Sequence, residues 1–412
     1  MTELERDRLE TRLCSLSVFG DIIDGEGGGY GGIDISAIFY CRHLDVKGRL
    51  AVCARLARNL ARYGCSLSEY LYRAVCESEN EYVKAVAAGR PVPPALKANA
   101  DADLDTLSAL TGYSPVELFD LGGYDGYVPA FENEKINLRL MYEARLASIT
   151  KCGYGIFASS TMFCVDDDGS IVPIESADTV TPDEFVGYES QRKQVYDNTR
   201  ALVENRPAAN ILLFGDAGTG KSSTVKSCAN MFSDYGVRLI ELRRDQLFTL
   251  RRVMGKIADN PLKFIIFIDD LSFGKNDDTF SMLKAVLEGS ASVKAKNAVI
   301  YATSNRRHIV KETFSDRGND LGADDIHKND TVQELISLSD RFGLTVYFEK
   351  PNKSLYLDIV HALAERYGIG TDAELDVKAE AFALSRGTRS PRAAEQFVNS
   401  LRAGNIGNGS TK

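Results

Sequence analysis

The chain has 412 residues, of which 44% are hydrophobic and 26% are charged. It is longer than one compact domain usually is, and its composition is typical of a soluble globular protein with enough apolar side chains for a core. The longest apolar runs, 211–214 and 264–268, are far shorter than the ~20 residues of a membrane-spanning helix, and the first residues do not resemble a secretory signal. We therefore expect a cytoplasmic protein that does not enter a membrane.

Charge is distributed unevenly along the chain, whose formal net charge is −9. Residues 1–182 contain 17 Lys and Arg against 27 Asp and Glu, whereas residues 183–412 contain 32 against 31. Strong binding to nucleic acid normally requires a basic patch, which argues against such a surface in the acidic N-terminal part and leaves a local patch in the C-terminal part open. The eight cysteines have no Cys-x-x-Cys spacing and the four histidines no metal-ligand pattern, so we expect buried or free thiols and no zinc site.

Residues 1–150 predict a mainly helical domain. The glycine-rich run 25–32 lacks the Lys-Ser ending of a phosphate loop and is interpreted as a flexible connection. No catalytic constellation is found in this part of the sequence, and recruitment of a client or partner is the role that we expect for it. Apolar side chains recur at helical spacing at 2–17, 46–63, 66–88, 101–110, 114–121 and 137–148.

Residues 151–182 are expected to form a β-hairpin that connects this domain to the next. Two runs, 154–165 and 170–174, flank the turn-forming sequence Asp-Asp-Gly-Ser at 167–170. From residue 208 onward, short apolar runs alternate with helical stretches, which is typical of a parallel α/β sheet.

The apolar run 211–214 leads directly into a match to the pattern Gly-x4-Gly-Lys-[Ser/Thr], and a helix is expected at 222–235. Glycines let the backbone curl and point N–H groups at phosphate oxygens, at a helix N-terminus whose dipole favours anions. Lys221 would reach the β and γ phosphates, and the Ser222 hydroxyl would bind Mg²⁺. An accidental glycine loop is very improbable between a strand and a helix, so we predict ATP binding with Mg²⁺. The candidate residues are Gly215, Asp216, Ala217, Gly218, Thr219, Gly220, Lys221, Ser222 and Ser223.

Further polar residues follow the predicted strands and helices of this C-terminal part. The apolar run 263–270 predicts a strand that ends in two carboxylates, the run 298–305 one that ends in an amide, and an arginine precedes the strand 344–348. Helices are expected at 354–367, 373–386 and 391–401. The residues concerned are Asp269 and Asp270, then Asn305, then Arg341, and finally Arg389 and Arg392 at the start of the last helix.

In this motif order, segment 183–403 resembles the AAA+ superfamily. The resemblance implies an α/β fold, with a parallel-sheet P-loop core at 183–350 and a helical lid at 351–403, and we expect 404–412 to be a disordered tail. The loop that contains Val186 and Gly187 resembles the loop that lines the adenine pocket in that superfamily. More narrowly, phrases such as Ile-Asp-Asp-Leu-Ser-Phe at 268–273 resemble a bacterial family of AAA+ ATPases of unknown function, which supports ATP binding and leaves the substrate open.

The resemblance also implies roles for the polar residues after the strands. Asp269 would hold Mg²⁺ through water. Asp270 stands where the superfamily usually has a glutamate that polarises the attacking water, and its shorter side chain argues for slow turnover. Asn305 would be a sensor amide near the γ-phosphate. The plainer interpretation, that these are polar residues at strand ends, is less favoured because of the motif order.

Two arginine sites are implied as well. Arg341 would project onto the nucleotide of a neighbouring subunit in a homo-oligomer, where it would stabilise charge on the transferred phosphoryl group. Its serious competitor is a surface arginine paired with Asp340 or Asp316. Arg392, or alternatively Arg389, would reach back to the nucleotide from the lid; the plainer alternative for both is a charged helix start.

Several functions are consistent with these motifs. We expect an ATPase that couples ATP binding and hydrolysis to remodelling of a protein or protein–nucleic-acid client. One alternative is a DNA-linked ATPase similar to helicase loaders and initiators, whose phosphate contacts would come from Arg243, Arg244, Arg251 and Arg252; a solvated helix face is slightly favoured for them. The other is a slowly hydrolysing nucleotide switch.

A protein-threading unfoldase is disfavoured. Unfoldases resemble one another in an aromatic-apolar-Gly loop after the second strand, and Phe248 at this place has no glycine beside it. Separately, the Asp- and Gly-rich run 309–330 predicts an exposed loop.

Overall fold

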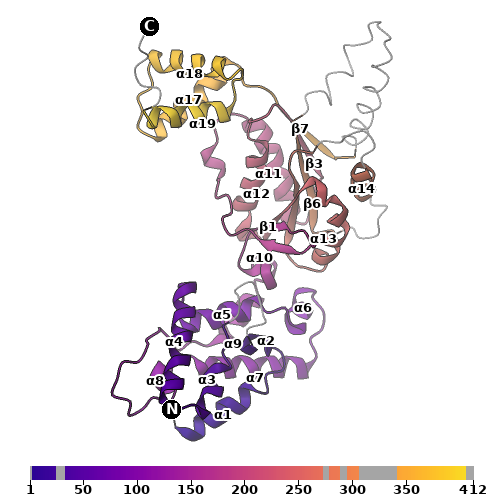
Figure 1. Cartoon of the computed structure of the whole chain (residues 1–412). Helices are drawn as coiled ribbons and strands as arrows, with labels where there is room; N and C mark the ends of the chain where they lie inside the picture. The colour runs from indigo at the N-terminus through magenta and orange to yellow at the C-terminus, as the bar shows by residue number, and fades with distance from the viewer. Residues whose placement is uncertain (1, 25–32, 272–277, 288–294, 306–340, 405–412) are drawn as a thin grey trace. The chain divides into compact units, whose positions relative to one another are not determined.

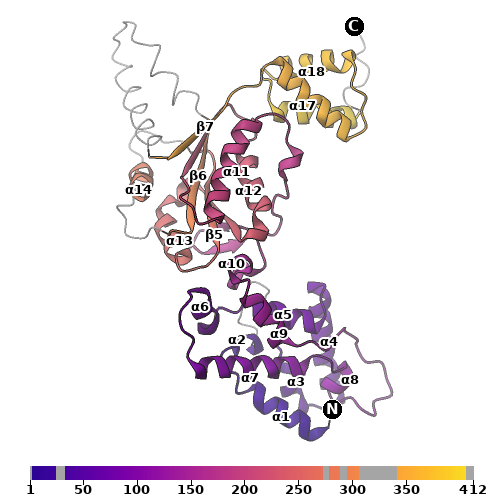
Figure 2. The same cartoon turned by 180° about the vertical axis from the view of Figure 1, so that it is seen from behind.

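The computed structural model describes residues 2–24, 33–271, 278–287, 295–305 and 341–404 (Figures 1 and 2). The chain divides into two compact units. The first, which we call the helical unit, comprises Met1–Ser160 with Asp259–Leu262, and the second, which we call the nucleotide unit, comprises Thr161–Ala258 with Lys263–Lys412. None of the described helices has the length and apolar character needed to cross a bilayer.

The described part of the helical unit is built from α-helices and short 3₁₀ turns, as its periodicity predicts. The helix expected at 46–63 is confirmed as α4, which begins after the Asp45 cap and ends at Gly64 in the left-handed region. The segment 66–88 is split, because the Asn80 side chain caps a new helix by accepting a hydrogen bond from Val83 N at 2.9 Å. The helices are α1 Glu3–Leu13, α2 Asp21–Asp24, α3 Ala37–Tyr40, α4 Val46–Tyr63, α5 Leu67–Glu77, α6 Glu81–Ala87, α7 Pro94–Leu110, α8 Pro115–Leu118, α9 Leu138–Leu146 and α10 Ile149–Cys152, with 3₁₀ turns at Cys41–His43 and Gly155–Ala158.

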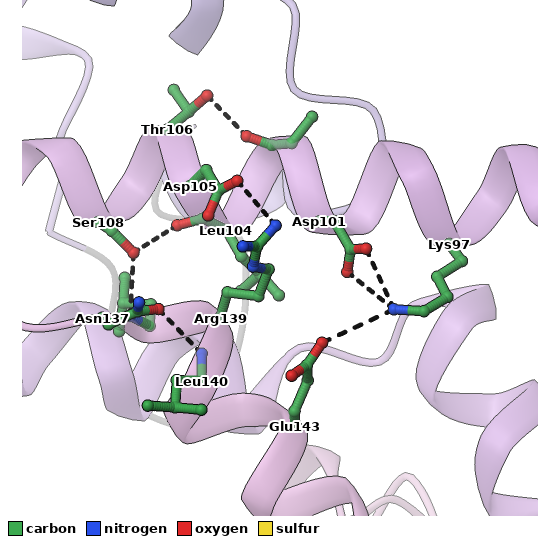
Figure 3. Close-up of polar contacts among 12 residues, drawn as sticks. Lys97, Asp101, Leu104, Asp105, Thr106, Ser108, Asn137, Arg139, Leu140 and Glu143 are labelled. Carbon is green, nitrogen blue, oxygen red and sulfur yellow. Dashed lines mark hydrogen bonds and ion pairs between the residues drawn. The ribbon is translucent and has the colours of Figure 1, made fainter.

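Helices α7 and α9 are joined by polar contacts along one side (Figure 3). Lys97 pairs with Asp101 and Glu143, at 3.1 and 3.7 Å, and Arg139 pairs with Asp105 at 3.1 Å. At the start of α9, the Ser108 Oγ accepts a hydrogen bond from Leu138 N at 2.9 Å. Behind these contacts lies an apolar core that includes Leu104, Leu107, Leu138 and Tyr142.

One buried carboxylate holds the start of the chain in place. Asp103, on α7, is 5% exposed, and its Oδ2 accepts hydrogen bonds from the backbone N–H groups of Ser17, Val18 and Phe19 at 2.9, 2.7 and 3.2 Å. Asp103 therefore has a structural role, because it accepts hydrogen bonds from three successive amides, of which that of Phe19 belongs to a buried residue.

The nucleotide unit contains a seven-stranded sheet in the order β2-β1-β4-β5-β6-β3-β7. Each neighbouring pair is parallel except β1 with β2. The α/β prediction is confirmed, because helices α12, α13 and α14 lie between the successive strands from β3 to β6 of a parallel sheet. The strands are β1 Met162–Val165, β2 Ile171–Pro173, β3 Ile211–Gly215, β4 Val237–Leu242, β5 Lys263–Ile268, β6 Ala298–Ser304 and β7 Leu344–Phe348.

The predicted hairpin is present but is shorter than expected, and it does not form a separate connector. Residues 155–158 form a 3₁₀ turn, so β1 begins only at Met162. Strand β1 pairs in parallel with β4, with Cys164 opposite Glu241, and Phe163 is fully buried. The hairpin thereby extends the edge of the sheet, and the boundary between the units falls between residues 160 and 161.

Helices cover both faces of the sheet and form the lid. Helices α11 and α12 lie side by side on one face, while α13 and α14 lie on the other (Figures 1 and 2). Helices α17–α19, at the yellow end of the chain, have their own core, which contains Tyr356, Val360, Ala379 and Phe397. The helices are α11 Glu189–Val203, α12 Lys221–Met231, α13 Leu250–Ile257, α14 Asp278–Leu287, α17 Lys353–Arg366, α18 Ala373–Ser385 and α19 Pro391–Arg402, with 3₁₀ turns at Pro182–Glu184, Ser233–Tyr235 and Arg244–Thr249. The predicted loop 309–330 and nearly all of the tail predicted at 404–412 lie outside the described residues.

Candidate functional site

The phosphate loop connects β3 to α12, as predicted. Its first residue, Gly215, has a φ of +134°, and a Cβ there would lie 2.0 Å from the carbonyl oxygen of Phe348 on the neighbouring strand. Gly218 also has positive φ, and a Cβ would press against Ser390 and Arg392 of the lid. Glycine is therefore required at both positions: at 215 because β3 packs closely on β7, and at 218 because the lid approaches the loop.

Lys221 is the first residue of α12 and is buried. Its Nζ donates hydrogen bonds to the carbonyl oxygens of Gly215 and Asp216, at 3.1 and 2.6 Å. Burial lowers the pKa of Lys221 to about 8, although Asp216, Asp269 and Asp270 oppose the shift; the positive charge of Arg392 adds to it. An ammonium group is therefore held at the head of the loop in an environment that favours an anionic ligand.

Asp269 is held in one orientation at the end of β5. Its Oδ1 accepts hydrogen bonds from Ser222 Oγ at 2.7 Å, from Thr303 Oγ1 at 2.5 Å and from Asp270 N at 3.1 Å. Ser222 and Asp269, predicted as metal ligands from separate motifs, are thus in direct contact. Sequence reasoning missed Thr303. The register of β6 on β5 sets Ala302 opposite Ile268, and this brings the next residue, Thr303, beside Asp269. Its position near the end of β6 was the signal that could have found it.

Asp270 and Asn305 also meet, although 35 residues separate them. Asn305 Nδ2 donates to Asp270 Oδ1 at 2.8 Å, and Asp270 N donates to Thr303 Oγ1 at 2.9 Å. The backbone of Asp270 has a φ of +50°. Because Asp and Asn enter this left-handed region more readily than longer side chains do, the conformation gives a structural reason for aspartate at this position.

These groups line one cavity of about 470 Å³. The phosphate loop and the carboxylates form part of its wall, and another part consists of apolar side chains from the 180–188 segment and from α17 together with several charged ones. Sequence reasoning missed the charged residues Arg192, Arg366 and Glu395, which no motif marks. The lining residues are Val180, Glu184, Phe185, Val186, Tyr188, Arg192, Ala217, Gly218, Thr219, Gly220, Lys221, Ser222, Ser223, Thr224, Asp269, Asp270, Thr303, Asn305, Ile359, Leu363, Arg366, Pro391, Arg392 and Glu395.

Three predicted binding residues support the cavity without being part of its described lining: Gly187, Gly215 and Asp216. A Cβ on Gly187, whose φ is +76°, would lie 2.5 Å from Leu355 Cδ1 at the start of α17. Gly215 and Asp216 present their carbonyl oxygens to Lys221.

The two lid arginines have different surroundings. Arg392 lines the cavity, and its backbone N–H donates to Gly218 O at 3.3 Å. Arg389 is instead engaged within the lid, because its guanidinium donates two hydrogen bonds to Glu380, at 3.0 and 2.8 Å. Of the two candidates, the geometry therefore favours Arg392 as the residue that faces a bound nucleotide.

Arg341 lies away from the cavity of its own subunit. It precedes β7, whose first residue Leu344 pairs with Ile211, whereas the last residue, Phe348, pairs with Gly215 at the phosphate loop. Because β7 has five residues and rises about 3.3 Å per residue, Arg341 lies beyond the end of the strand that is farther from the phosphate loop, roughly 13 Å or more from it. Its expected partners, Asp316 and Asp340, lie outside the described residues.

The residues of the cavity fit a nucleotide with a hard divalent cation. The backbone of the loop forms a cradle at the start of α12, and Ser222 and Asp269 offer oxygen ligands of the kind that Mg²⁺ prefers. The described residues contain no group of three or more His, Cys, Asp or Glu side chains that could hold a metal ion by themselves. A magnesium site needs none, because Mg²⁺ in phosphate-binding sites uses one or two carboxylates together with the phosphates of the substrate.

A parallel sheet with a phosphate loop after β3, a carboxylate pair after β5, an amide after β6 and a three-helix lid defines a P-loop protein of the AAA+ class. Within that class, residues 158–405 match the family described as "Protein of unknown function (DUF815)", and the chain belongs to this family.

Two named relatives align with about half of this chain at low sequence identity. The chain is 22% identical over 240 residues to proteasome-activating nucleotidase 2 of Haloferax volcanii and 24% identical over 226 residues to the peroxisomal ATPase PEX6 of Yarrowia lipolytica. These alignments cover 54% and 47% of this chain, and only 56% and 22% of the respective relatives.

Two similar solved structures are the Holliday junction branch migration motor RuvB of Thermotoga maritima and AMPPCP-bound DnaA of Aquifex aeolicus. Sequence identities are 16% and 17%, and TM-scores are 0.36 and 0.39. The matches cover 54% and 55% of this chain, and 64% and 65% of those chains.

Proposed function

We propose that this protein binds ATP with Mg²⁺ in the cavity, hydrolyses it, and uses the cycle to remodel a protein or protein–nucleic-acid client. One observation carries the proposal. Lys221, the contact between Ser222 and Asp269, and the contact between Asp270 and Asn305 bring residues of three separate motifs together in one cavity. The same cavity is also lined by apolar side chains, which suit the base of a nucleotide.

Each residue has a role that its surroundings support. The backbone N–H groups of the loop and the Lys221 ammonium bind the triphosphate, and Ser222 and Asp269 would hold the cation. Mg²⁺, when bound, neutralises charge on the β and γ phosphates. Asp270 accepts the proton of the attacking water, and the Asn305 amide, bonded to Asp270 Oδ1, orients that carboxylate. Arg392 adds a positive charge from the lid.

We infer that the complete site requires a homo-oligomer. Support comes from the position of Arg341 before the end of β7 that is farther from the phosphate loop, which suits action on the nucleotide of a neighbouring subunit. Charge supplied in trans at this point would stabilise the transferred phosphoryl group.

A DNA-linked loader or initiator is the second candidate. Two of the four arginines that would contact phosphates are already engaged by the hairpin: Arg243 pairs with Asp167 at 2.8 Å, and Arg252 donates to Asp168 O at 2.9 Å. This arrangement favours the protein client. The third candidate, a slowly hydrolysing switch, draws support from the Asn305 contact, which engages one oxygen of the Asp270 carboxylate.

The test is ATP binding and turnover in matched lysine variants of α12. Lys221→Ala removes the ammonium group at the loop, and we expect ATP affinity to fall more than 100-fold in isothermal titration. Lys226→Ala is the control, because Lys226 lies on the same helix and pairs with Glu241 at 3.4 Å outside the cavity. Undiminished ATP affinity in a folded Lys221→Ala variant contradicts the assignment. Turnover measured with and without single-stranded and duplex DNA separates the first two candidates, because only a DNA-linked ATPase should be stimulated.

A further inference from the structure

Arg192 is a charged residue of the cavity that no sequence motif marks. It lies in the first turn of α11, and its backbone N–H donates to Tyr188 O at 2.9 Å. Only 9% of its side chain is exposed. Its guanidinium lies 5.2 Å from the centre of the Phe185 ring, in the part of the cavity formed by the 180–188 segment.

The guanidinium of Arg192 has few partners for so buried a group. Its one ion pair, with Glu189, spans 3.6 Å, and the Glu189 side chain is 76% exposed, which makes the pair weak. No hydrogen bond to this guanidinium is found in the described part of the chain. Burial lowers the pKa of Arg192, in agreement with this poor compensation, yet an arginine stays protonated.

Other buried arginines in the described part of the chain do make hydrogen bonds through their guanidinium groups. Arg6, which is 6% exposed, donates from Nη2 to Glu117 O at 2.8 Å and pairs with Asp120, although its Nε has no partner among the described residues. Arg238, also 6% exposed, donates to the carbonyl oxygens of Ser233 and Val237. Because a buried cation without hydrogen bonds is costly, the exception at Arg192 indicates that its donors are used by a ligand in the cavity.

We propose that Arg192 binds the base of the nucleotide. This inference rests on the proposed function, in which Lys221 and Ser222 take the triphosphate at the other end. A base among Phe185, Val186 and the other apolar side chains brings ring nitrogens with lone pairs and a π face. The guanidinium only donates hydrogen bonds and stacks on aromatic rings, so it suits both features.

The test compares ligands that keep or lack the base. We would measure the affinities of the full-length protein for Mg²⁺-ATP, for ribose 5′-triphosphate and for inorganic triphosphate. Arg192→Met keeps an unbranched apolar side chain and removes the charge and the donors, and Arg192→Lys keeps the charge without the planar fork. Arg200→Ala is the control, because Arg200 lies on the same helix, is 50% exposed, pairs with Asp197 and is not among the cavity's lining residues.

We expect Arg192→Met to weaken ATP binding by about tenfold or more, the loss that follows from one hydrogen bond to a charged group. Its affinities for ribose 5′-triphosphate and inorganic triphosphate should match those of the parent. KM for ATP should rise at unchanged kcat, and Arg192→Lys should recover part of the affinity. Equal losses for all three ligands, or none, overturn the inference. If the parent binds no ATP, the proposed function fails with it; if the parent binds ATP and only the Arg192 result is negative, the proposed function stands.

Discussion

The two units bury charge in different ways. In the helical unit, Asp103 is 5% exposed and accepts three backbone hydrogen bonds from residues 17–19. In the nucleotide unit, Lys221 is 4% exposed and donates hydrogen bonds to two backbone carbonyl groups, while the guanidinium of Arg192 makes none to the described residues. The first charge is fully used by the fold, whereas the other two line a cavity.

This difference separates structural from functional burial. A buried charge that binds backbone groups away from the cavity, as Asp103 does, stabilises the chain and is not exposed to a ligand. A charge that lines a cavity with few partners reduces stability until a ligand arrives, so its presence is evidence for binding. Substitutions in the two units should therefore affect different measurements, and the following predictions test that separation.

The largest expected effect is at Arg341. Arg341→Ala should keep ATP affinity and lose turnover by about a thousandfold, because it removes charge supplied to a neighbouring subunit. Specific activity of the parent should rise with protein concentration. Mixing Arg341→Ala with Lys221→Ala should restore part of the activity, since a mixed interface pairs an intact loop with an intact arginine. A surface role for Arg341 predicts lower stability and no rescue on mixing.

Asp270→Asn should lower turnover by about a hundredfold or more while ATP stays bound, because the amide cannot accept the proton of the attacking water. Asparagine tolerates the φ of +50° at this position, so stability should not change. Asp269→Asn is the comparison: it should also weaken the dependence on Mg²⁺. Single-turnover hydrolysis at the parent rate in Asp270→Asn would assign the base elsewhere.

In the helical unit the effect should fall on stability alone. Asp103→Ala leaves three backbone N–H groups without their acceptor, and we expect a loss of about 2 kcal/mol in the free energy of unfolding, measured in urea. ATP affinity should be unchanged. The matched control is Asp105→Ala on the same helix, whose side chain is 50% exposed and pairs only with the surface residue Arg139, and which should change stability by less than about 0.5 kcal/mol. Weaker ATP binding in Asp103→Ala would break the separation between the units.

The smallest expected effect is a dependence on pH. Because the pKa of Lys221 is about 8 before ATP binds, the ammonium form is lost as the pH rises through 8, and ATP affinity should fall roughly tenfold between pH 7.5 and 9.5. The stability of the protein without nucleotide should change in the opposite direction. Between pH 8 and the ordinary lysine value of 10.5, the unfolded chain binds more protons, so stability rises with pH. Lys221→Met should lack this rise.

Much of the fold could be predicted because its signals are local. The strand at 344–348 and the helix at 46–63 have the predicted bounds, since periodicity within a segment decides which face is buried. Bounds were missed where a distant or capping contact decides them. The segment 66–88 breaks at the Asn80 cap, and the hairpin joins the sheet because β1 pairs with β4, a partner more than 70 residues away in the chain.

The candidate site divides in the same way. By itself, the sequence determined the phosphate loop and the metal-binding pair Ser222 and Asp269 as candidates, because eight consecutive residues and two strand ends contain that information. Only the tertiary structure decided that Thr303 bonds Asp269, that Asn305 bonds Asp270, that Arg392 and not Arg389 lines the cavity, and that Arg192 is buried there. Each of these contacts depends on strand register or on the packing of helices far apart in the chain, and no local pattern of residues records either.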